Sequence, residues 1–348
     1  MRQFLKQTFA SLIGSLAGLI LFFGIGTGGL LLLIIAAASK DTGPQVKDKS
    51  VLVFDLSLDI SDSQPSSSTS EALGQVLSSD QSNKITLRTV LDVLDKARQD
   101  KRIIALYLDG SQSSNGGSAG LATLKEVREA LERFRASGKK IIAYDVDLGK
   151  REYYLSSVAD TVILNPMGNL DINGFSSQPL FYTGALEKFG VGVQVIRVGK
   201  YKSAVEPFIL KKLSPENRQQ TQVLLSRLWV GFLTTVSKNR KISPQQLQAI
   251  ANNQGELMAP EALQQRLIDK VAYFDEVVAD LKKMTGSDVD DKSFRQISLN
   301  TYAKAEAPSS NKRSSRNKIA VVYAEGEIVD GEGEGQQVGG DSFARQMR

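Results

Sequence analysis

The chain contains neither cysteine nor histidine among its 348 residues. Without cysteine it can form no disulfide, no thiolate nucleophile and no thiolate-bound zinc site. The missing cysteines leave the cellular compartment open, because many proteins of oxidising compartments also lack disulfides. Without histidine, a Ser-His-Asp triad is excluded. Any acid-base chemistry must therefore use lysine, aspartate, glutamate or tyrosine.

Several signatures of ligand binding are absent as well. The sequence contains no Walker-type phosphate loop and no dinucleotide-binding fingerprint. Its formal net charge of +5 is spread along the chain, and no basic stripe alternates with aromatic residues. We therefore expect no cofactor, no metal ion and no nucleic-acid partner. A hydrophobic content of 41% and a charged content of 23% fit a folded globular protein with room for one to three domains.

A long uncharged stretch near the N-terminus predicts a membrane anchor at residues 1–40. Arg2 and Lys6 precede residues 7–39, which carry no charge. About 20 apolar residues cross a bilayer, and positive charge before the span places the N-terminus in the cytoplasm and the main domain on the far side of the membrane. A cleaved signal peptide is the rival interpretation, although its apolar region is only ~7–15 residues long.

Beyond the anchor, short apolar runs alternate with amphipathic segments. This alternation is typical of βαβ units with a mainly parallel sheet, and it predicts a first α/β domain at residues 41–214. The predicted strands are 51–56, 103–108, 141–146, 161–164 and 193–198, and the predicted helices are 87–98, 121–136, 152–159 and 180–188.

The character of the sequence changes after this domain. Residues 215–302 predict a helical segment that returns to the core, with a long helix at 216–239, a restart at Ser243-Pro244 and two short helices within 260–284. Residues 303–317 are polar and charged without an apolar period, which predicts a linker.

The sequence after the linker resembles the beginning of the first domain. Residues 318–330, like residues 50–62, show a buried-strand pattern followed by an alternating extension that ends in aspartate. Residues 342–348 then resemble the first turns of a helix, as at Leu87. We interpret residues 318–348 as the truncated start of a second repeat. One strand and two helical turns are too little to bury a core.

Two lysines are candidates for a proton-accepting residue. Lys202 and Lys200 both follow the predicted strand 193–198 and a turn begun by Gly199. A lysine desolvated there can act as a neutral base, and a Ser/Lys dyad needs only an amine that takes the hydroxyl proton and later returns it. Glu206 could hold either lysine by a salt bridge. An exposed loop lysine without a chemical role is the alternative.

Two other groups of residues have side chains or backbone groups that could form a site. Backbone N–H groups of Gly116-Gly117-Ser118, between a predicted strand and a helix, could bind an anion or oxyanion, or the segment is simply a flexible loop. Asp145 and Asp147 end a predicted strand, but two carboxylates are too few ligands for a hard cation.

The segment Arg197-Val-Gly-Lys-Tyr-Lys-Ser-Ala-Val-Glu-Pro-Phe208 resembles the lysine motif of the long form of signal peptide peptidase A, also called protease IV, a family of membrane-anchored serine peptidases. In that family the lysine of the Tyr-Lys-Ser-Ala sequence is the general base, and it corresponds to Lys202. The likeness runs from the predicted anchor to residue 348. Three further segments resemble the same family: Tyr153-Tyr-Leu-Ser-Ser157, Asn165-Pro-Met-Gly168 and Ile172-Asn-Gly-Phe175.

The resemblance implies a fold, an activity and an assembly. The fold is a tandem of two ClpP/crotonase-like spiral α/β domains, of which the first supplies the lysine and the second the serine nucleophile and oxyanion glycines. The implied assembly is a bowl-shaped homotetramer in a bacterial inner or thylakoid membrane, in contact with membrane lipid. The implied substrates are cleaved signal peptides and other unfolded hydrophobic segments.

The chain departs from the family's catalytic repeat at one position. There a serine precedes a Gly-Gly-Tyr-Trp-like turn, whereas the matching segment here is Lys150-Arg-Glu-Tyr-Tyr154, so Lys150 stands at the serine position. The second repeat is interrupted at Arg348, before its own serine. We therefore expect the 348-residue chain to be inactive alone. Ser203 is not expected to be the nucleophile, because adjacent residues usually point apart.

Two other functions stay open at this stage. A catalytically inactive, membrane-anchored assembly or adaptor domain of the same fold would share the anchor and the spiral domain. An acyl-CoA-type binder of the crotonase fold would also share the fold, but the predicted anchor and the missing ligand motifs argue against it.

Overall fold

The computed structural model describes most of the chain from residue 44 onward. The described ranges are 44–62, 84–111, 119–288, 290–305, 319–324, 326–334 and 337–348, with isolated helical positions between Thr8 and Phe22. Within the described part of the chain, no helix is both long and apolar enough to cross a membrane. Most of the predicted anchor at 1–40 lies outside the described residues, and the anchor stays a prediction.

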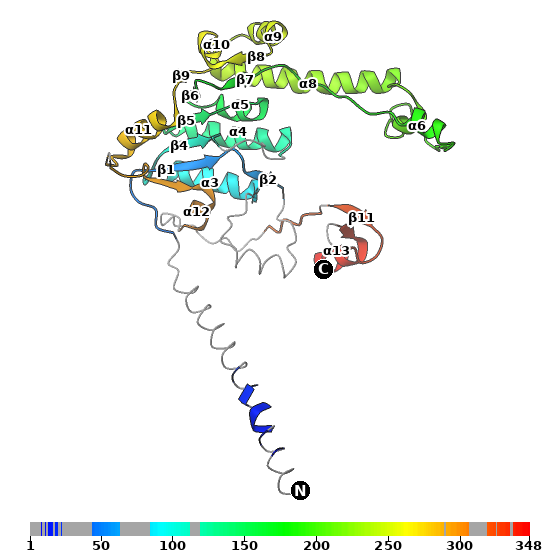
Figure 1. The fold of residues 1–348 in the computed structure, drawn as a ribbon, viewed down its shortest axis with the longest axis horizontal. Coiled ribbons are helices and arrows are strands. Elements are labelled where there is room, and N and C mark those ends of the chain that lie inside the picture. The colour runs from blue at the N-terminus through cyan, green and yellow to red at the C-terminus, as the bar shows by residue number, and fades with distance from the viewer. Residues whose placement is uncertain are drawn as a thin grey trace.

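A six-stranded sheet forms the centre of the molecule (Figure 1). Its strand order is β10-β1-β4-β5-β6-β9, and every neighbouring pair is parallel. The strands are β1 (Ser50–Asp55), β4 (Ile103–Asp109), β5 (Lys140–Asp145), β6 (Thr161–Leu164), β9 (Lys270–Val271) and β10 (Gln296–Ser298). The predicted parallel α/β architecture is confirmed, while the finer assignment to a ClpP/crotonase-like spiral stays a prediction.

Both faces of this sheet are covered. One face presents alternate residues such as Leu52 and Leu106 to the larger hydrophobic core. The opposite face presents Tyr107 and Tyr144 to a smaller core beneath α11 (Phe274–Thr285). Burial on both faces explains why the strands are nearly continuous apolar runs. Helices that pack on the larger core include α3 (Leu87–Gln99), α4 (Leu121–Ala136), α5 (Lys150–Ser156) and α8 (Pro215–Arg240).

Most predicted elements match the structure within three residues at either end. Helix α4 begins and ends at the predicted residues, and Gly138 after it takes a φ of +88°, the left-handed conformation that favours glycine at a helix end. The predicted strands 51–56, 103–108, 141–146 and 161–164 and the predicted helices 87–98, 152–159, 180–188 and 216–239 all have counterparts.

The predicted segment 215–302 does return to the core after α8. It contributes two strands to the central sheet, and α12 ends at Lys304, so the first two residues of the predicted linker at 303–317 are helical. The rest of that linker, from residue 306 on, lies outside the described residues. The added elements are β7 (Asn169–Asp171), which pairs antiparallel with β8 (Glu256–Met258), and the helices α9 (Pro244–Asn253), α10 (Ala259–Gln264) and α12 (Leu299–Lys304).

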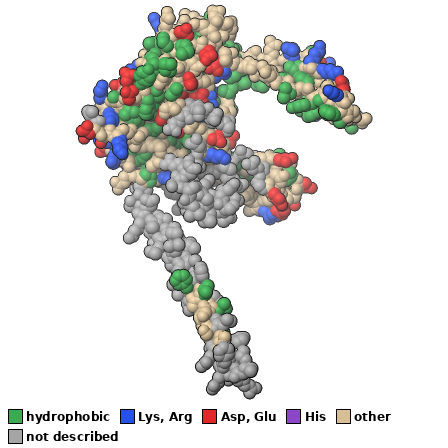
Figure 2. Space-filling model, in the orientation of Figure 1, with side chains coloured by type: hydrophobic (Ala, Val, Ile, Leu, Met, Phe, Trp, Pro, Cys, Tyr) green, Lys and Arg blue, Asp and Glu red, His purple; other side chains and the backbone are tan. Residues whose placement is uncertain are grey.

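Residues 176–214 form an arm that projects from the body at the start of α8 (Figure 1). Two short helices lie in it, α6 (Thr183–Lys188) and α7 (Glu206–Ile209). The prediction of a buried strand at 193–198 is wrong, because this segment has no strand partner in the described structure and its side chains are largely exposed. Hydrophobic side chains line the arm in Figure 2, and the most exposed are Leu180, Phe189, Ile196 and Val198.

The start of the predicted second repeat reproduces part of the first. β2 (Asp59–Ser61) pairs in parallel with β3 (Lys84–Thr86), and α3 follows β3 directly. β11 (Glu327–Val329) pairs in parallel with β12 (Gln337–Gly339), and α13 (Gly340–Met347) follows directly. The residues that correspond to β1 in this second set, 319–323, form no strand and are exposed. Among the described residues they have no neighbours like β4 and β10, and an unpaired strand is not stable.

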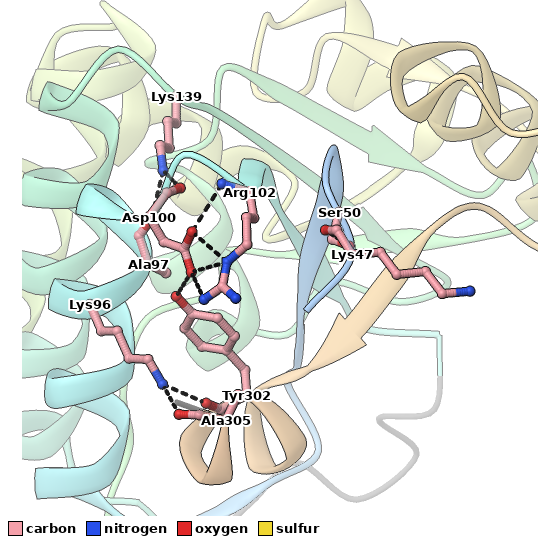
Figure 3. A network of polar contacts seen from close by, with 9 residues as sticks. All are labelled: Lys47, Ser50, Lys96, Ala97, Asp100, Arg102, Lys139, Tyr302 and Ala305. Atoms are coloured by element: carbon pink, nitrogen blue, oxygen red, sulfur yellow. Dashed lines mark hydrogen bonds and ion pairs between the residues drawn. The ribbon is translucent and has the colours of Figure 1, made fainter. Parts of the chain in front are cut away.

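A buried carboxylate ties α12 to the body (Figure 3). Asp100 is 1% exposed and accepts hydrogen bonds from Arg102 Nε at 3.0 Å and from Tyr302 Oη at 2.8 Å. Burial opposes ionisation of Asp100, but the hydrogen bonds from Arg102 and Tyr302 outweigh it and hold its pKa below the ordinary value.

Two lysines close the helix ends on either side of this carboxylate. Lys96 Nζ donates to the carbonyls of Tyr302 and Ala305 at the end of α12, and Lys139 Nζ donates to the carbonyls of Ala97 and Asp100 at the end of α3. Burial lowers the pKa of both lysines. A cation at a helix C-terminus satisfies carbonyls that have no partner within the helix, so α3 and α12 are held together.

Tyr302→Phe should lower the free energy of unfolding by about 2 kcal/mol, because a hydrogen bond to a buried charged group is lost while the ring is kept. Urea denaturation measures the difference. Tyr182→Phe is the matched control, since the Tyr182 side chain lies on the exposed arm, and it should change stability by less than about 0.5 kcal/mol. Equal stability of the Tyr302→Phe variant and the natural chain would contradict the role given to this network.

Candidate functional site

Lys202 lies in an exposed turn of the arm, between Gly199 and α7. Gly199 takes a φ of +101°, a conformation that glycine alone adopts readily, and this turns the chain after Val198. The ammonium groups of Lys202 and of Lys200 are both exposed, and neither has a partner among the described residues. The sequence predicts that Lys202 is shielded from water next to a buried strand. The segment 193–198 forms no strand in the described structure, and Lys202 is exposed.

The backbone of the Lys202 turn is held by an arginine. Arg197 Nη1 donates to the Lys202 carbonyl at 2.7 Å and lies 3.9 Å from Glu206 Oε1. Arg197 thus spans the turn and connects its backbone to a carboxylate four residues beyond Lys202. The lysine side chain remains free while its main chain is fixed.

Glu206 is the anchor of the turn, and it is fully buried. Ser214 Oγ donates to Glu206 Oε1 at 2.6 Å, and Asn217 Nδ2 donates to Oε2 at 2.9 Å. Burial alone would raise the pKa of Glu206, but the hydrogen bonds from Ser214 and Asn217 and the charge of Arg197 lower it below the ordinary value. The expectation that Glu206 pairs with a lysine is wrong, because its oxygens are occupied by the start of α8.

Ser214 and Asn217 were not singled out from the sequence. Ser214 is the N-cap of α8, with its hydroxyl accepting from the Asn217 backbone N–H at 3.1 Å and proline at the first helical position. A Ser-Pro pair is a helix-start signal, and Ser243-Pro244 was recognised by it. The same Ser-Pro signal at Ser214 locates the N-cap of α8, but no sequence pattern near it indicates that the Glu206 side chain contacts this cap.

Glu206→Gln should loosen the Lys202 turn without unfolding the body. One acceptor oxygen becomes a donor, which leaves Ser214 or Asn217 unsatisfied at a cost of about 1–3 kcal/mol. Hydrogen exchange followed by mass spectrometry should show faster exchange at residues 197–213 and unchanged exchange in β4 and β5. Glu187→Gln, at an exposed ion pair with Lys211 on the same arm, is the control. Unchanged exchange in the Glu206 variant would show that the carboxylate does not hold the turn.

Lys150 is the first residue of α5, at the C-terminal edge of the sheet. Its Nζ donates to Asp171 Oδ2 at 2.8 Å and to Asn173 Oδ1 at 2.6 Å. The N-cap is Gly149, where a Cβ would come within 2.6 Å of Glu152 Oε2. The position thus lies where the chain passes from β5 into α5, and its amine is already paired with a carboxylate.

Asp145 and Asp147 do not form a cation site. Asp145 Oδ1 accepts from the backbone N–H groups of Val146 and Asp147, and Oδ2 is buried without a partner among the described residues. Burial raises the pKa of Asp145 to about 8, with a further contribution from the charge of Glu152. The side chain is therefore mostly uncharged at neutral pH. Among the described residues no group of three or more acidic side chains is arranged to hold a metal ion. The segment Gly116–Ser118 lies outside the described residues.

The buried carboxyl predicts a loss of stability with rising pH. The pKa of Asp145 is raised in the folded chain, so between 3.8 and about 8 the unfolded chain releases the proton while the folded chain keeps it. Each pKa unit is worth about 1.4 kcal/mol. Asp145→Asn cannot ionise, so its free energy of unfolding should exceed that of the natural chain by several kcal/mol at pH 8 and by much less at pH 4.5. Denaturant titrations at both pH values measure this.

The exposed Asp92→Asn on α3 is the control for this pH dependence and should leave it unchanged, since Asp92 forms only a surface ion pair with Arg88. If the difference in free energy of unfolding between Asp145→Asn and the natural chain is the same at pH 4.5 and at pH 8, the assignment of a buried neutral carboxyl is contradicted.

Comparisons with known proteins bear on both lysines. A model of Peptidase family S49 matches residues 133–288, a range that includes Lys150 and Lys202. Protease 4 of Salmonella typhi is 35% identical over 310 residues, which cover 86% of this chain and 49% of that protein. Protease 4 of Haemophilus influenzae is 30% identical over 332 residues, which cover 92% of this chain and 53% of that protein. The chain thus spans about half the length of these relatives.

Among solved structures the likeness is loose. A mutant of the 1510-N membrane-bound stomatin-specific protease, in complex with a substrate peptide, superposes with a TM-score of 0.36 at 11% identity, over 76% of this chain and 94% of that chain. A TM-score this low supports no conclusion about the fold, whose description rests on the strand order and pairing of the sheet.

Proposed function

From the premise that this chain belongs to the signal peptide peptidase A and protease IV family of S49 peptidases, we propose that it is the lysine-bearing part of a serine endopeptidase. Lys202 is the general base of a Ser/Lys dyad in this proposal, and the serine comes from a second repeat outside these residues. Relatives about twice as long as this chain support a second repeat.

The observation that carries the proposal is the way the Lys202 turn is built. Arg197 and the buried Glu206 fix its backbone, while the Lys202 ammonium is left without a partner among the described residues. A surface lysine without a role needs no such support. A base that must meet a nucleophile on another part of the assembly needs a fixed main chain and an unoccupied amine.

The proposed chemistry uses the amine twice. Neutral Lys202 takes the proton of the serine hydroxyl while the serine oxygen attacks the peptide carbonyl, and the lysine then gives that proton to the departing amine. Water attacks the resulting ester while the lysine accepts a proton from it; the bond between the acyl carbon and the serine oxygen then breaks, the lysine returns the proton to that oxygen, and the acid product leaves. Packing of the serine-bearing repeat over the arm would remove Lys202 from water and favour the neutral amine.

The exposed apolar surface of the arm supports the remaining parts of the proposal. Leu180, Phe189 and Ile196 are 71%, 80% and 102% exposed, which is costly for a surface left in water. We propose that a neighbouring repeat or subunit of a homotetramer covers them. The apolar N-terminal stretch supports a location at a membrane with cleaved signal peptides and other membrane-associated hydrophobic peptides as substrates.

A non-catalytic adaptor of the same fold is the second candidate. It is favoured by one observation, the paired Lys150 at the start of α5, where the family's catalytic repeat has serine. This observation shows that the first repeat has no nucleophile at that place, and it says nothing about a second repeat.

Substitution of the two lysines in the protein completed with its second repeat separates the candidates. Lys202→Ala should lower kcat/KM for casein or a signal-peptide substrate on the order of 1,000-fold, the usual contribution of a positioned base. Lys200→Ala should stay within about twofold of the natural protein, because its ammonium is equally exposed but lies outside the Tyr-Lys-Ser-Ala motif.

Unfolding temperatures of both variants serve as the folding control. Equal loss of activity in both variants, or full activity of Lys202→Ala, would contradict the assignment of Lys202. A completed natural protein that cleaves neither substrate would favour the adaptor.

A further inference from the structure

A cavity of about 380 Å³ lies beside Lys150, within the body and separate from the arm that carries Lys202. Ligand sites usually occupy ~300–1,000 Å³, so this cavity suits a ligand the size of one or two amino-acid side chains. It is formed where α4, α5 and α8 meet. Its lining residues are Ala119, Leu121, Leu124, Lys150, Arg151, Glu152, Phe175 and Phe232.

Most of the cavity wall is apolar and well supported. Phe232 stacks on Trp229 with ring centroids 5.2 Å apart, and Phe175 meets the edge of Trp229 at 5.9 Å. Leu121 and Leu124 contribute the wall on α4. Interlocked aromatic rings keep a fixed shape, so the cavity is ready to receive an apolar group.

The remaining wall offers one hydrogen-bond donor, on Lys150, that the described residues do not use. Two of the three Lys150 ammonium protons are taken by Asp171 and Asn173. Arg151 Nε is buried and has no acceptor among the described residues, although its Nη atoms are bonded to the Leu56 and Leu58 carbonyls. Because Arg151 Nε is buried, a ligand cannot reach it, and the third Lys150 proton is the donor available to an oxygen supplied by a ligand.

The charges of this wall are balanced. Lys150 is 2.8 Å from Asp171, and Arg151 is 3.3 Å from Glu152. Each cation therefore has its own carboxylate, and the site has no excess positive charge for an anion. A neutral acceptor next to an apolar group fits this donor best. A peptide carbonyl beside a leucine- or phenylalanine-sized side chain has this chemistry.

We propose that this cavity is a second peptide-binding site, which takes one apolar side chain of an extended hydrophobic segment while a neighbouring backbone carbonyl accepts a hydrogen bond from Lys150. The inference rests on the proposed function for its substrate class. It assigns the first repeat a binding role at the place where the family's other repeat has its nucleophile. A long substrate would then be held in the body as well as at Lys202.

The chain contains a built-in reporter for this site. Trp229 is its one tryptophan, and it contacts both aromatic residues of the cavity wall. Emission of the 348-residue chain can be followed during titration with acetyl-Ala-Ala-Leu-Ala-Ala-amide. We expect a saturable change, and at least tenfold weaker binding of the matched peptide with serine in place of leucine. Binding needs no nucleophile, so the result is independent of peptidase activity.

Two variants and one control test the two parts of the cavity wall, the Lys150 donor and the apolar side chains. Lys150→Met should weaken binding of the leucine peptide at least fivefold, and Leu121→Asn, on the apolar wall, at least tenfold. Lys125→Met is the control, because Lys125 is an exposed residue of the same helix, α4, and it should bind as the natural chain does. Thermal unfolding confirms that each variant is folded, and calorimetry replaces fluorescence if the emission of a variant is altered.

Three results would overturn the proposal: no saturable signal, equal binding of the leucine and serine peptides, or binding of the leucine peptide that neither folded variant weakens. Laurate that binds more tightly than the leucine peptide would identify a lipid site instead. If the leucine peptide binds as expected and the completed protein cleaves nothing, the peptidase proposal fails while the cavity assignment stands.

Discussion

A parallel sheet must have both faces covered and every strand paired, and this requirement governs what the chain can and cannot build alone. The six strands from β10 to β9 meet it, with a large helical layer on one face and α11 on the other. Two segments do not meet it. Residues 193–198 in the arm and residues 319–323 after the linker have strand-like sequences but no neighbours in the described structure, and their side chains are exposed. On the proposed function, a second repeat or a neighbouring subunit covers both segments.

Polar contacts hold the Lys202 turn of the arm in place. The tip of the arm has almost no hydrophobic core, so these contacts act instead of apolar packing. The turn depends on the buried Glu206 carboxylate, which joins Arg197 on one side to Ser214 and Asn217 at the start of α8 on the other. The long helix α8 in turn rests on the body through Phe232, Leu233 and Val236. Lys202 is thus connected to the sheet through a chain of defined contacts, although its amine has no partner among the described residues.

Sequence patterns predicted the strands and helices whose burial follows a regular spacing of apolar residues along the chain. Apolar runs such as 103–108 and 161–164 predict buried parallel strands, and the spacing of Leu124, Val127 and Leu131 predicts α4. The alternating pattern at 193–198 led to a wrong prediction of a strand. Such a pattern indicates that a segment can fit into a sheet, but it does not indicate that a neighbouring strand is present to pair with it. The partners Ser214 and Asn217 of Glu206 could not be predicted. They lie at the start of α8, eight or more residues along the chain, and no periodic pattern in the sequence indicates that the chain folds back there. The family motif distinguishes Lys202 from Lys200, whereas their physical setting does not, since both are exposed in the structure.

The central claim is that Lys202 meets a serine from a second repeat. The most direct measurement is the structure of the completed protein with its serine in place. The account predicts that Lys202 Nζ lies within hydrogen-bond reach of a serine Oγ, roughly 2.6–3.2 Å, and that residues 193–198 are paired in a sheet. A completed, folded protein in which the Lys202 amine still faces solvent, with no serine near it, would contradict the account.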